Sequence, residues 1–165
     1  MIKLDSFTNN SKENIVEMFL DENVRKTYML PHFKNKEEAE ALFERIQRMS
    51  LQENRFVKCI YYDDGINGIN AIGIINETDK NEYEIELGYA INPRFQNKGY
   101  CTLALNKAIH ILLDKGYKKI ICGAFSTNIP SIRVMEKVGM KRTDKIEYIN
   151  YLDEDHECIF YEYNN

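Results

Sequence analysis

The sequence has few cysteines, no long apolar run and little net charge, and each of these absences excludes a class of protein. The four cysteines lie far apart and form no C-x-x-C pair, which favours reduced thiols over a disulfide framework or a zinc site. No stretch approaches the ~20 apolar residues of a membrane span, and the N-terminus has no apolar run of the signal-peptide type. We therefore expect a cytoplasmic protein with no metal site and no membrane partner.

The net charge and the chain length indicate which partners and how many domains to expect. A net charge of −4 argues against general nucleic-acid binding, and it is too small to identify a cationic substrate. The chain has 165 residues, of which 44% are hydrophobic and 29% charged, as in an ordinary globular protein. This length suits one hydrophobic core, so we expect a single domain over residues 1–165.

The most informative stretch runs from Tyr83 to Lys115. Large residues alternate with carboxylate or small residues from Tyr83 to Ile91, which predicts a strand with two different faces. A polar turn follows from Arg94 to Gly99, and beyond it the apolar residues recur at helical intervals. A strand, a polar turn with a glycine and a helix together form an anion site, because free N–H groups and the helix dipole point out of the turn.

This turn resembles the phosphate-binding signature of a known enzyme family. The residues from Gln96 to Cys101, QNKGYC, resemble the Q/R-x-x-G-x-G/A motif of the GNAT acyltransferases, which bind acetyl-CoA. Cys101 departs from the motif, but its side chain is small enough to allow close approach. The resemblance implies that acetyl-CoA is the co-substrate and that the N–H groups of the turn hold its pyrophosphate. The implied cofactor-binding residues of the turn are Gln96, Asn97, Lys98, Gly99, Tyr100 and Cys101.

Further blocks, in the same order, resemble the ribosomal-protein N-acetyltransferase branch of this family, the RimJ/RimL-like proteins. Glu86–Tyr89, ELGY, is similar to the E-x-G-Y block of that branch. Asn128–Ser131 and Met135–Met140 are similar to its N-x-x-S and E-K-x-G-[FM] blocks. The recognisable part spans roughly residues 82–145, and several ordered blocks together are far more specific than one motif.

The resemblance implies an N-acetyltransferase that moves the acetyl group of acetyl-CoA directly to a primary amine in a ternary complex. Glu86 and Ser131 would be the catalytic residues: Glu86 takes the amine proton, directly or through water, and Ser131 lies near the thioester sulfur. The implied contacts with the pantetheine are Tyr89, Ala90, Ile91 and Asn128. Family members also form homodimers, so we expect a homodimer by analogy.

Some assignments stay open at the level of sequence. Glu84 shares a strand face with Glu86, and either is a candidate base, although Glu86 lies closer to Gly88 and Ala90, whose small size leaves room for a ligand. Other GNAT enzymes have a tyrosine acid where this chain has Met135, which cannot donate a proton. A CoA-binding sensor or partner module without transfer activity is therefore the alternative function.

The acceptor amine is also open. Its pocket would come from residues 21–50 and 140–158, which resemble nothing specific. Protein N-termini, polyamines, amino acids and aminoglycosides are all consistent with a primary-amine acceptor. We interpret Cys101 as a packing residue rather than a reactive thiol, because the sequence indicates no neighbouring base for it.

Hydrophobic periodicity predicts the remaining elements. We expect strands over residues 1–7, 56–62, 66–75, 119–125, 140–150 and 156–163, the last two joined by an acidic turn at 153–155. We expect helices that begin at Ser11 and Asn35, a short helical piece over 24–30, and a helix from Asn128 that ends at Gly139. This order matches that of the GNAT family and predicts an α/β (α+β) fold, with a central mixed, mostly antiparallel sheet flanked by helices.

Overall fold

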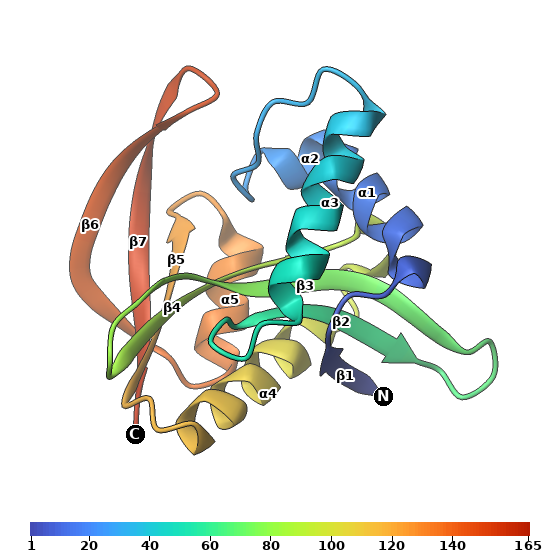
Figure 1. The fold of residues 1–165 in the computed structure, drawn as a ribbon. Coiled ribbons are helices and arrows are strands. Elements are labelled where there is room, and N and C mark those ends of the chain that lie inside the picture. Colours follow the sequence, from blue (N-terminus) through green and yellow to red (C-terminus); the bar gives the residue numbers. More distant parts are fainter.

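The structure is a computed structural model that describes residues 1–165, and its elements follow the order expected from the sequence (Figure 1). The strands are β1 (Ile2–Asp5), β2 (Val57–Asp63), β3 (Ile69–Lys80), β4 (Glu84–Ile91), β5 (Lys119–Phe125), β6 (Lys141–Tyr151) and β7 (Glu154–Asn164). The helices are α1 (Lys12–Leu20), α2 (Glu22–Arg25), α3 (Lys36–Ser50), α4 (Tyr100–Asp114) and α5 (Ile129–Lys137). Short 3-10 turns, η1 (Asn9–Ser11) and η2 (Pro93–Phe95), precede α1 and the loop that leads to α4.

All strands belong to one seven-stranded sheet in the order β1-β2-β3-β4-β5-β7-β6. Every neighbouring pair is antiparallel except β4 and β5, which are parallel and joined through α4, as a parallel connection requires a crossover. The predicted α/β fold with a mixed, mostly antiparallel sheet is therefore confirmed.

Helices cover both faces of the sheet, with α4 and α5 on one side and α1, α2 and α3 on the other (Figure 1). β4 contributes to both cores: Ile85, Leu87 and Ile91 are buried under α4, whereas Ala90 is buried with α1 and α3. The alternation in the sequence thus correctly predicts a two-faced strand. Because β4 lies in the middle of the sheet, both helical layers position it.

The first helices differ from the prediction at their starts. α2 spans Glu22–Arg25 and not residues 24–30, because the Asp21 side chain accepts hydrogen bonds from the first free N–H groups of the helix. Ser11 precedes α1 as predicted, but its hydroxyl donates to the Thr8 carbonyl oxygen (2.6 Å) and accepts the Thr8 N–H (3.2 Å), and it accepts no N–H group of the helix. The extra turn η1 therefore forms in front of α1.

Two hairpin boundaries also differ. β3 begins only at Ile69 and continues to Lys80, because Asp64 accepts the N–H of Ile66 (2.8 Å) and holds the preceding segment in a turn. The β6–β7 turn consists of Leu152 and Asp153, whose φ angles are 54° and 59°, and the rest of the acidic segment belongs to β7. A two-residue turn of this hand matches the twist of the flanking strands.

Candidate functional site

The strands β4 and β5 separate in the middle of the sheet. Their parallel pairing ends at Leu87 and Cys122, although β4 continues to Ile91 and β5 to Phe125. Beyond this point β4 stays paired with β3, and β5 stays paired with β7. Figure 1 shows β5 and β7 turning away from β4. The second half of β4 therefore has one strand edge with no strand beside it, which we call the β4–β5 gap.

The backbone groups that face this gap follow from the strand ladder. Asn92 donates its N–H to the Ile72 carbonyl oxygen in β3 (2.8 Å), and antiparallel residues alternate between facing their partner strand and facing away. Ala90 accordingly turns its carbonyl oxygen toward β3, where it leaves no room for a side chain at Gly73. The N–H and C=O groups of Tyr89 are thus directed into the β4–β5 gap, where a ligand can pair with them.

The turn that follows β4 has free backbone donors. Asn97 and Gly99 have left-handed backbone conformations, with φ of 59° and 78°. The N–H groups of residues 97–102 have no acceptor within the chain, and they lie at the N-terminus of the fifteen-residue helix α4. Gln96 donates from Nε2 to the Ile91 carbonyl oxygen (2.9 Å), which fixes the turn to the end of β4. The arrangement is an anion cradle at one end of the β4–β5 gap.

The positively charged side chains near the cradle differ in their partners. Arg94 pairs with Glu17 (2.6 Å) and donates to Asn14, so its charge is partly neutralised. Lys98 has no carboxylate partner, and its Nζ lies 5.7 Å from the centre of the Phe95 ring. Lys98 is therefore the side chain of the turn that is available to an anion.

A side-chain contact links β4 to α5 across the gap. The Tyr89 hydroxyl lies 2.9 Å from Ser131 Oγ and 3.3 Å from the Ser131 carbonyl oxygen. Asn128 is the N-cap of α5, and its Oδ1 accepts the Ser131 N–H (3.4 Å). Burial raises the pKa of Tyr89 well above its ordinary value, so the phenol stays protonated. Predicted site residues from two distant segments, Tyr89 and Ser131, are thus in direct contact.

The two candidate carboxylates have different surroundings. Glu84 forms an ion pair with Lys119 (2.8 Å), which lowers the pKa of Glu84. Glu86 has no cationic partner and accepts a hydrogen bond from Thr78 Oγ1 (3.1 Å). Thr78 is the extra residue of a β-bulge in β3, whereas β4 itself keeps its alternation. The sequence left Glu84 and Glu86 open, and the geometry leaves Glu86 as the half-buried carboxylate without a counter-ion.

Comparison with known protein families assigns the chain to one of them. The acetyltransferase (GNAT) domain family matches residues 2–141. The chain belongs to this GNAT family. Acetyl-CoA is the co-substrate of the family, as the sequence predicted, and one of the similar structures described below contains it. None of the helices combines the length and the apolar composition of a membrane-spanning helix.

A relative of known sequence and several solved structures resemble this GNAT chain. An uncharacterized N-acetyltransferase, YnaD of Bacillus subtilis (strain 168), is 41% identical over 66 residues, which are 37% of this chain and 36% of that protein. The chain thus aligns with little more than a third of this relative. A GNAT acetyltransferase from Bacillus anthracis has a TM-score of 0.80 at 21% identity and covers 99% of this chain and 94% of its own.

Two further structures have ligands in their descriptions. The microcin self-immunity acetyltransferase MccE, in complex with acetyl-CoA and AMP, has a TM-score of 0.82 at 19% identity and covers 99% of this chain and 92% of its own. RimL, a ribosomal alpha-N-protein acetyltransferase in complex with coenzyme A, has a TM-score of 0.79 at 12% identity and covers 99% and 93%. At these identities the likeness establishes the GNAT fold.

The anion cradle of this GNAT chain fits the pyrophosphate of acetyl-CoA. A side chain placed on Gly99 would have no atom within 4 Å, so the space in front of the turn is open. Burial raises the pKa of Cys101 to about 12, so its thiol stays protonated, as expected of a packing residue. Tyr100 stacks on Tyr62 with 4.4 Å between the ring centroids, and its backbone N–H is one of the free donors of the turn. Gln96, Asn97, Lys98 and Gly99 complete the turn that the sequence predicted.

The small residues of β4 do not leave the open space that the sequence suggested. Ala90 is buried in the core under α1 and α3, because that core continues over the end of β4. The room above Gly88 is filled by Thr78 and Tyr28, which lie 3.3 and 3.6 Å from the position of a Cβ atom there. Tyr28 is fixed by a hydrogen bond to Asn76 (2.7 Å). The space above Gly88 is therefore closed to an acceptor.

The position at which other GNAT enzymes have a tyrosine acid is buried in this chain. Met135 is fully buried in the core beneath α4, so neither its chemistry nor its location allows proton donation at the gap. Sequence reasoning missed Tyr151, which lies 126 residues from Arg25 and donates to its carbonyl oxygen (2.5 Å). Tyr151 also accepts the N–H of Leu30 (3.3 Å). This side chain joins the loop after α2 to the β6–β7 hairpin, the two segments in which the acceptor pocket was expected, and no sequence signal indicated the contact.

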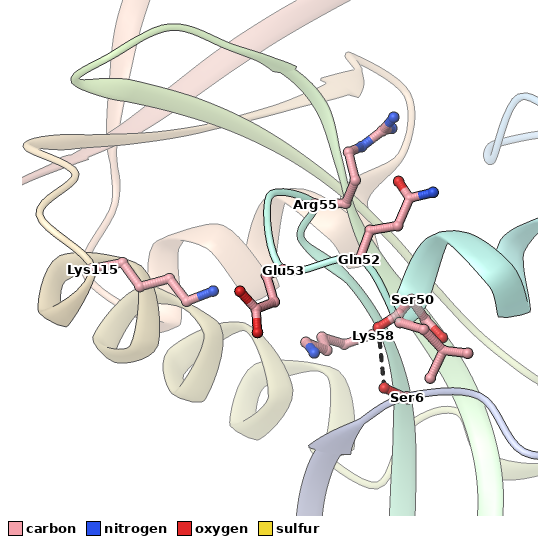
Figure 2. Close-up of a pocket in the computed structure, with 8 residues that line it drawn as sticks. Ser6, Ser50, Gln52, Glu53, Arg55, Lys58 and Lys115 are labelled. Carbon is pink, nitrogen blue, oxygen red and sulfur yellow. Dashed lines mark hydrogen bonds between the residues drawn. The ribbon is translucent and has the colours of Figure 1, made fainter.

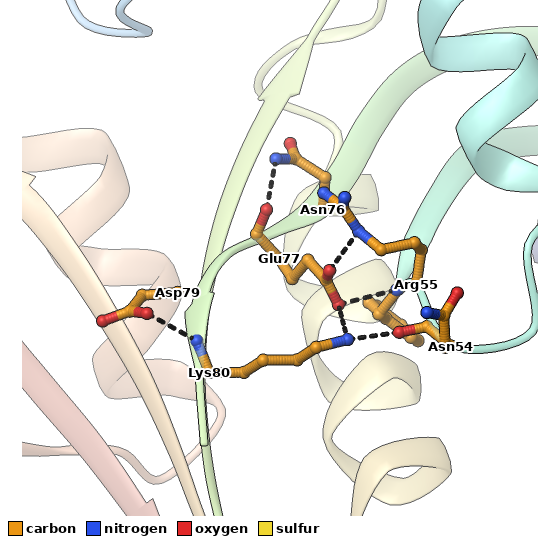
Figure 3. Close-up of polar contacts among 7 residues, drawn as sticks. Asn54, Arg55, Asn76, Glu77, Asp79 and Lys80 are labelled. Atoms are coloured by element: carbon orange, nitrogen blue, oxygen red, sulfur yellow. Dashed lines mark hydrogen bonds and ion pairs between the residues drawn. The ribbon is translucent and has the colours of Figure 1, made fainter.

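Two other hollows lie away from the gap. The first, of about 440 Å³, is lined by polar residues at the C-terminal ends of α3 and α4, where Ser6 donates to the Ser50 carbonyl oxygen (3.0 Å) (Figure 2). The second, of about 500 Å³, shares Glu53, Arg55 and Lys115 with the first. Its wall includes Glu77, whose buried carboxylate accepts from Lys80 (3.0 Å) and pairs with Arg55 (Figure 3). None of the predicted site residues lines either hollow, so both are separate from the predicted acetyl-CoA site.

Proposed function

We propose that this GNAT protein is an N-acetyltransferase that moves the acetyl group of acetyl-CoA directly to a primary amine in a ternary complex. One observation carries the proposal: the β4–β5 gap connects the anion cradle at residues 97–102 with Glu86 on one face of the sheet and Ser131 on the other. A thioester held in this gap has on one side a carboxylate that can deprotonate the amine, and on the other side a hydroxyl that can donate a hydrogen bond. This is the arrangement that direct transfer needs.

The cofactor side of the mechanism uses backbone groups. The free N–H groups of the turn hold the pyrophosphate, and the N–H and C=O of Tyr89 pair with the pantetheine amides. An N–H group at this edge polarises the thioester carbonyl as negative charge develops on its oxygen. Asn128 keeps the first turn of α5 beside the pantetheine through its cap.

The acceptor side uses Glu86. An alkyl amine with a pKa near 10.4 costs about 4.6 kcal/mol to deprotonate at pH 7, whereas a protein N-terminus near 7.8 costs about 1 kcal/mol. Glu86 takes this proton, directly or through water, as the amine nitrogen attacks the thioester carbonyl carbon. The carbon–sulfur bond then breaks and the sulfur leaves as the thiolate. Its conjugate acid has a pKa near 8.5, so a hydrogen bond from Ser131 suffices in place of a tyrosine acid.

The acceptor is a protein N-terminus or a small-molecule amine. The RimJ/RimL-like motifs favour an α-amino group, and the similar RimL structure is described as an alpha-N-protein acetyltransferase. The similar MccE structure is described as a complex with acetyl-CoA and AMP, so we keep small-molecule amines among the candidate acceptors. A homodimer follows from analogy with the family.

Two measurements test the proposal. Acetyl-CoA should raise the free energy of unfolding by about 2.7 kcal/mol at a hundredfold excess over Kd, and a thermal shift would report it. Release of free CoA should then be followed with N-terminal peptides, polyamines, amino acids and aminoglycosides, with the acetylated product identified by mass spectrometry. Binding without CoA release from any amine would support the alternative, a CoA-binding sensor module, and no binding at all would refute both.

A further inference from the structure

The hydroxyl of Tyr89 reaches across the β4–β5 gap to the side chain that the proposed mechanism uses at the sulfur. Its oxygen lies 2.9 Å from Ser131 Oγ, a normal O–H···O distance, and 3.3 Å from the Ser131 carbonyl oxygen, a long one. We propose that Tyr89 is a positioning residue, whose phenol donates to Ser131 Oγ and thereby directs the Ser131 hydrogen toward the sulfur of bound acetyl-CoA. This inference rests on the proposed function.

The contact between Tyr89 and Ser131 can run in two directions. Each hydroxyl has one hydrogen, and a carbonyl oxygen only accepts. If Tyr89 donates to Ser131 Oγ (2.9 Å), the Ser131 hydrogen remains free for a ligand. In the reverse arrangement Ser131 donates to the Tyr89 oxygen and Tyr89 donates to the Ser131 carbonyl oxygen (3.3 Å), which leaves neither hydrogen free. A thioester sulfur that accepts from Ser131 therefore selects the first arrangement.

Ser131 needs such a partner because of its place in the fold. It lies in the first turn of α5, where a serine hydroxyl can rotate between staggered positions and bond to carbonyl oxygens three or four residues earlier. A hydrogen bond from Tyr89 favours the staggered position of Oγ that lies 2.9 Å from the phenol oxygen, and this limits the directions open to the Ser131 hydrogen. Burial keeps the phenol protonated, so Tyr89 remains a donor throughout the working pH range.

A double-mutant cycle in the whole protein tests the coupling. Ser131→Ala should lower kcat by ~10²-fold, and Tyr89→Phe by ~10-fold with little change in the KM for acetyl-CoA. The double variant should be no slower than Ser131→Ala alone, because Tyr89 acts only through Ser131. Tyr61→Phe is the matched control, since it also removes a tyrosine hydroxyl, bonded to the Ser6 carbonyl oxygen (2.9 Å) away from the gap, and it should leave kcat unchanged. Multiplicative losses in the double variant would overturn the inference while leaving amine acetylation intact.

A second measurement needs no acetyl transfer. In Ser131→Cys the new thiol takes the place of the hydroxyl, and a hydrogen bond from Tyr89 should stabilise its thiolate. The pH profile of alkylation, mapped by mass spectrometry, should give a pKa about one unit lower in Ser131→Cys than in Ser131→Cys combined with Tyr89→Phe. The native thiols give little background, because burial raises the pKa values of Cys59 and Cys101 to about 12 and that of Cys158 to about 11. Equal pKa values in the two variants would overturn the positioning role, even if the protein proved to have no acetyltransferase activity.

Discussion

Glu84 and Lys119 form an ion pair across the parallel strands β4 and β5, with 2.8 Å between the carboxylate oxygen and Nζ. This ion pair lies where β4 and β5 are still paired as parallel strands, and it neutralises the charge of Glu84. Glu86, two residues further along β4, forms no ion pair and accepts a hydrogen bond from Thr78 Oγ1 (3.1 Å). Two carboxylates on one strand face thus have different surroundings: Glu84 pairs with Lys119, and we propose that Glu86 faces the acceptor amine.

Glu86→Gln should therefore lower the rate with an alkyl amine by ~10²-fold or more near pH 7. The loss should shrink toward pH 10, because the amine then loses its proton without help. Rates measured from pH 6 to 10 with the best acceptor check this, with Glu84→Gln as the control on the same face. A parallel profile for Glu86→Gln, offset by a small constant factor, would show that another group carries the proton.

Gly99→Val should raise the KM for acetyl-CoA by at least ~10-fold, because a branched residue at a φ of 78° distorts the turn and crowds the pyrophosphate. Gly65→Val provides a matched control: Gly65 has a φ of 75° and equally open surroundings, but it lies in the β2–β3 turn. Both variants should lose similar stability in thermal unfolding, and only Gly99→Val should lose affinity for acetyl-CoA. An unchanged KM would place the pyrophosphate elsewhere.

Glu77→Gln should destabilise the fold in a pH-dependent way. Burial opposes the charge of Glu77, but the Phe56 N–H (2.8 Å), Lys80 and Arg55 outweigh it and lower the pKa of this carboxyl (Figure 3). A lowered folded-state pKa stabilises the protein above the unfolded-state pKa, and the effect is lost as pH falls through the folded-state value. We expect a loss of about 1–3 kcal/mol in the free energy of unfolding at pH 7.

Urea unfolding at pH 7 and at pH 3 measures this effect, with the exposed Glu82→Gln as the control. The difference between wild type and Glu77→Gln should become smaller at pH 3, because the unfolded chain takes up a proton at this carboxyl once the pH falls below its ordinary pKa. A difference that is the same at both pH values would mean that packing around the side chain, and not its charge, stabilises the fold.

Tyr151→Phe should weaken acceptor binding more than cofactor binding. The change removes the hydrogen bond to Arg25 and the acceptor for Leu30, worth about 1 kcal/mol, so the KM for the amine should rise ~5-fold. The KM for acetyl-CoA should stay within about twofold, since the loop lies away from the cradle. Tyr148→Phe is the control, because Tyr148 is exposed on the same strand and bonds only to Glu157. Equal effects on both substrates would remove the loop from the acceptor site.

The sequence predicts best what depends on neighbours along the chain. The strand, turn and helix from Tyr83 to Lys115 follow from local periodicity, and so does the exposed N–H cradle. The capping of α2 by Asp21 and the two-residue turn at Leu152 and Asp153 were missed because several turn chemistries suit the same residues.

What the sequence could not predict depends on contacts between distant segments. Nothing near Gly88 indicates that Tyr28, sixty residues earlier in the chain, fills the space above Gly88. The contact between Tyr89 and Ser131 spans 42 residues and depends on how far β5 turns away from β4. Such packing is set by the whole sheet, so a motif can name these residues without showing which of them touch.

Direct transfer to an amine is the central claim, and CoA release in the absence and presence of the acceptor tests it most directly. Rapid-quench measurement at enzyme concentrations above the acetyl-CoA concentration should show CoA formation only when the amine is present, with the acetyl group on the amine and none on the protein. A stoichiometric burst of CoA without amine, together with an acetylated protein in the mass spectrum, would contradict the ternary-complex mechanism.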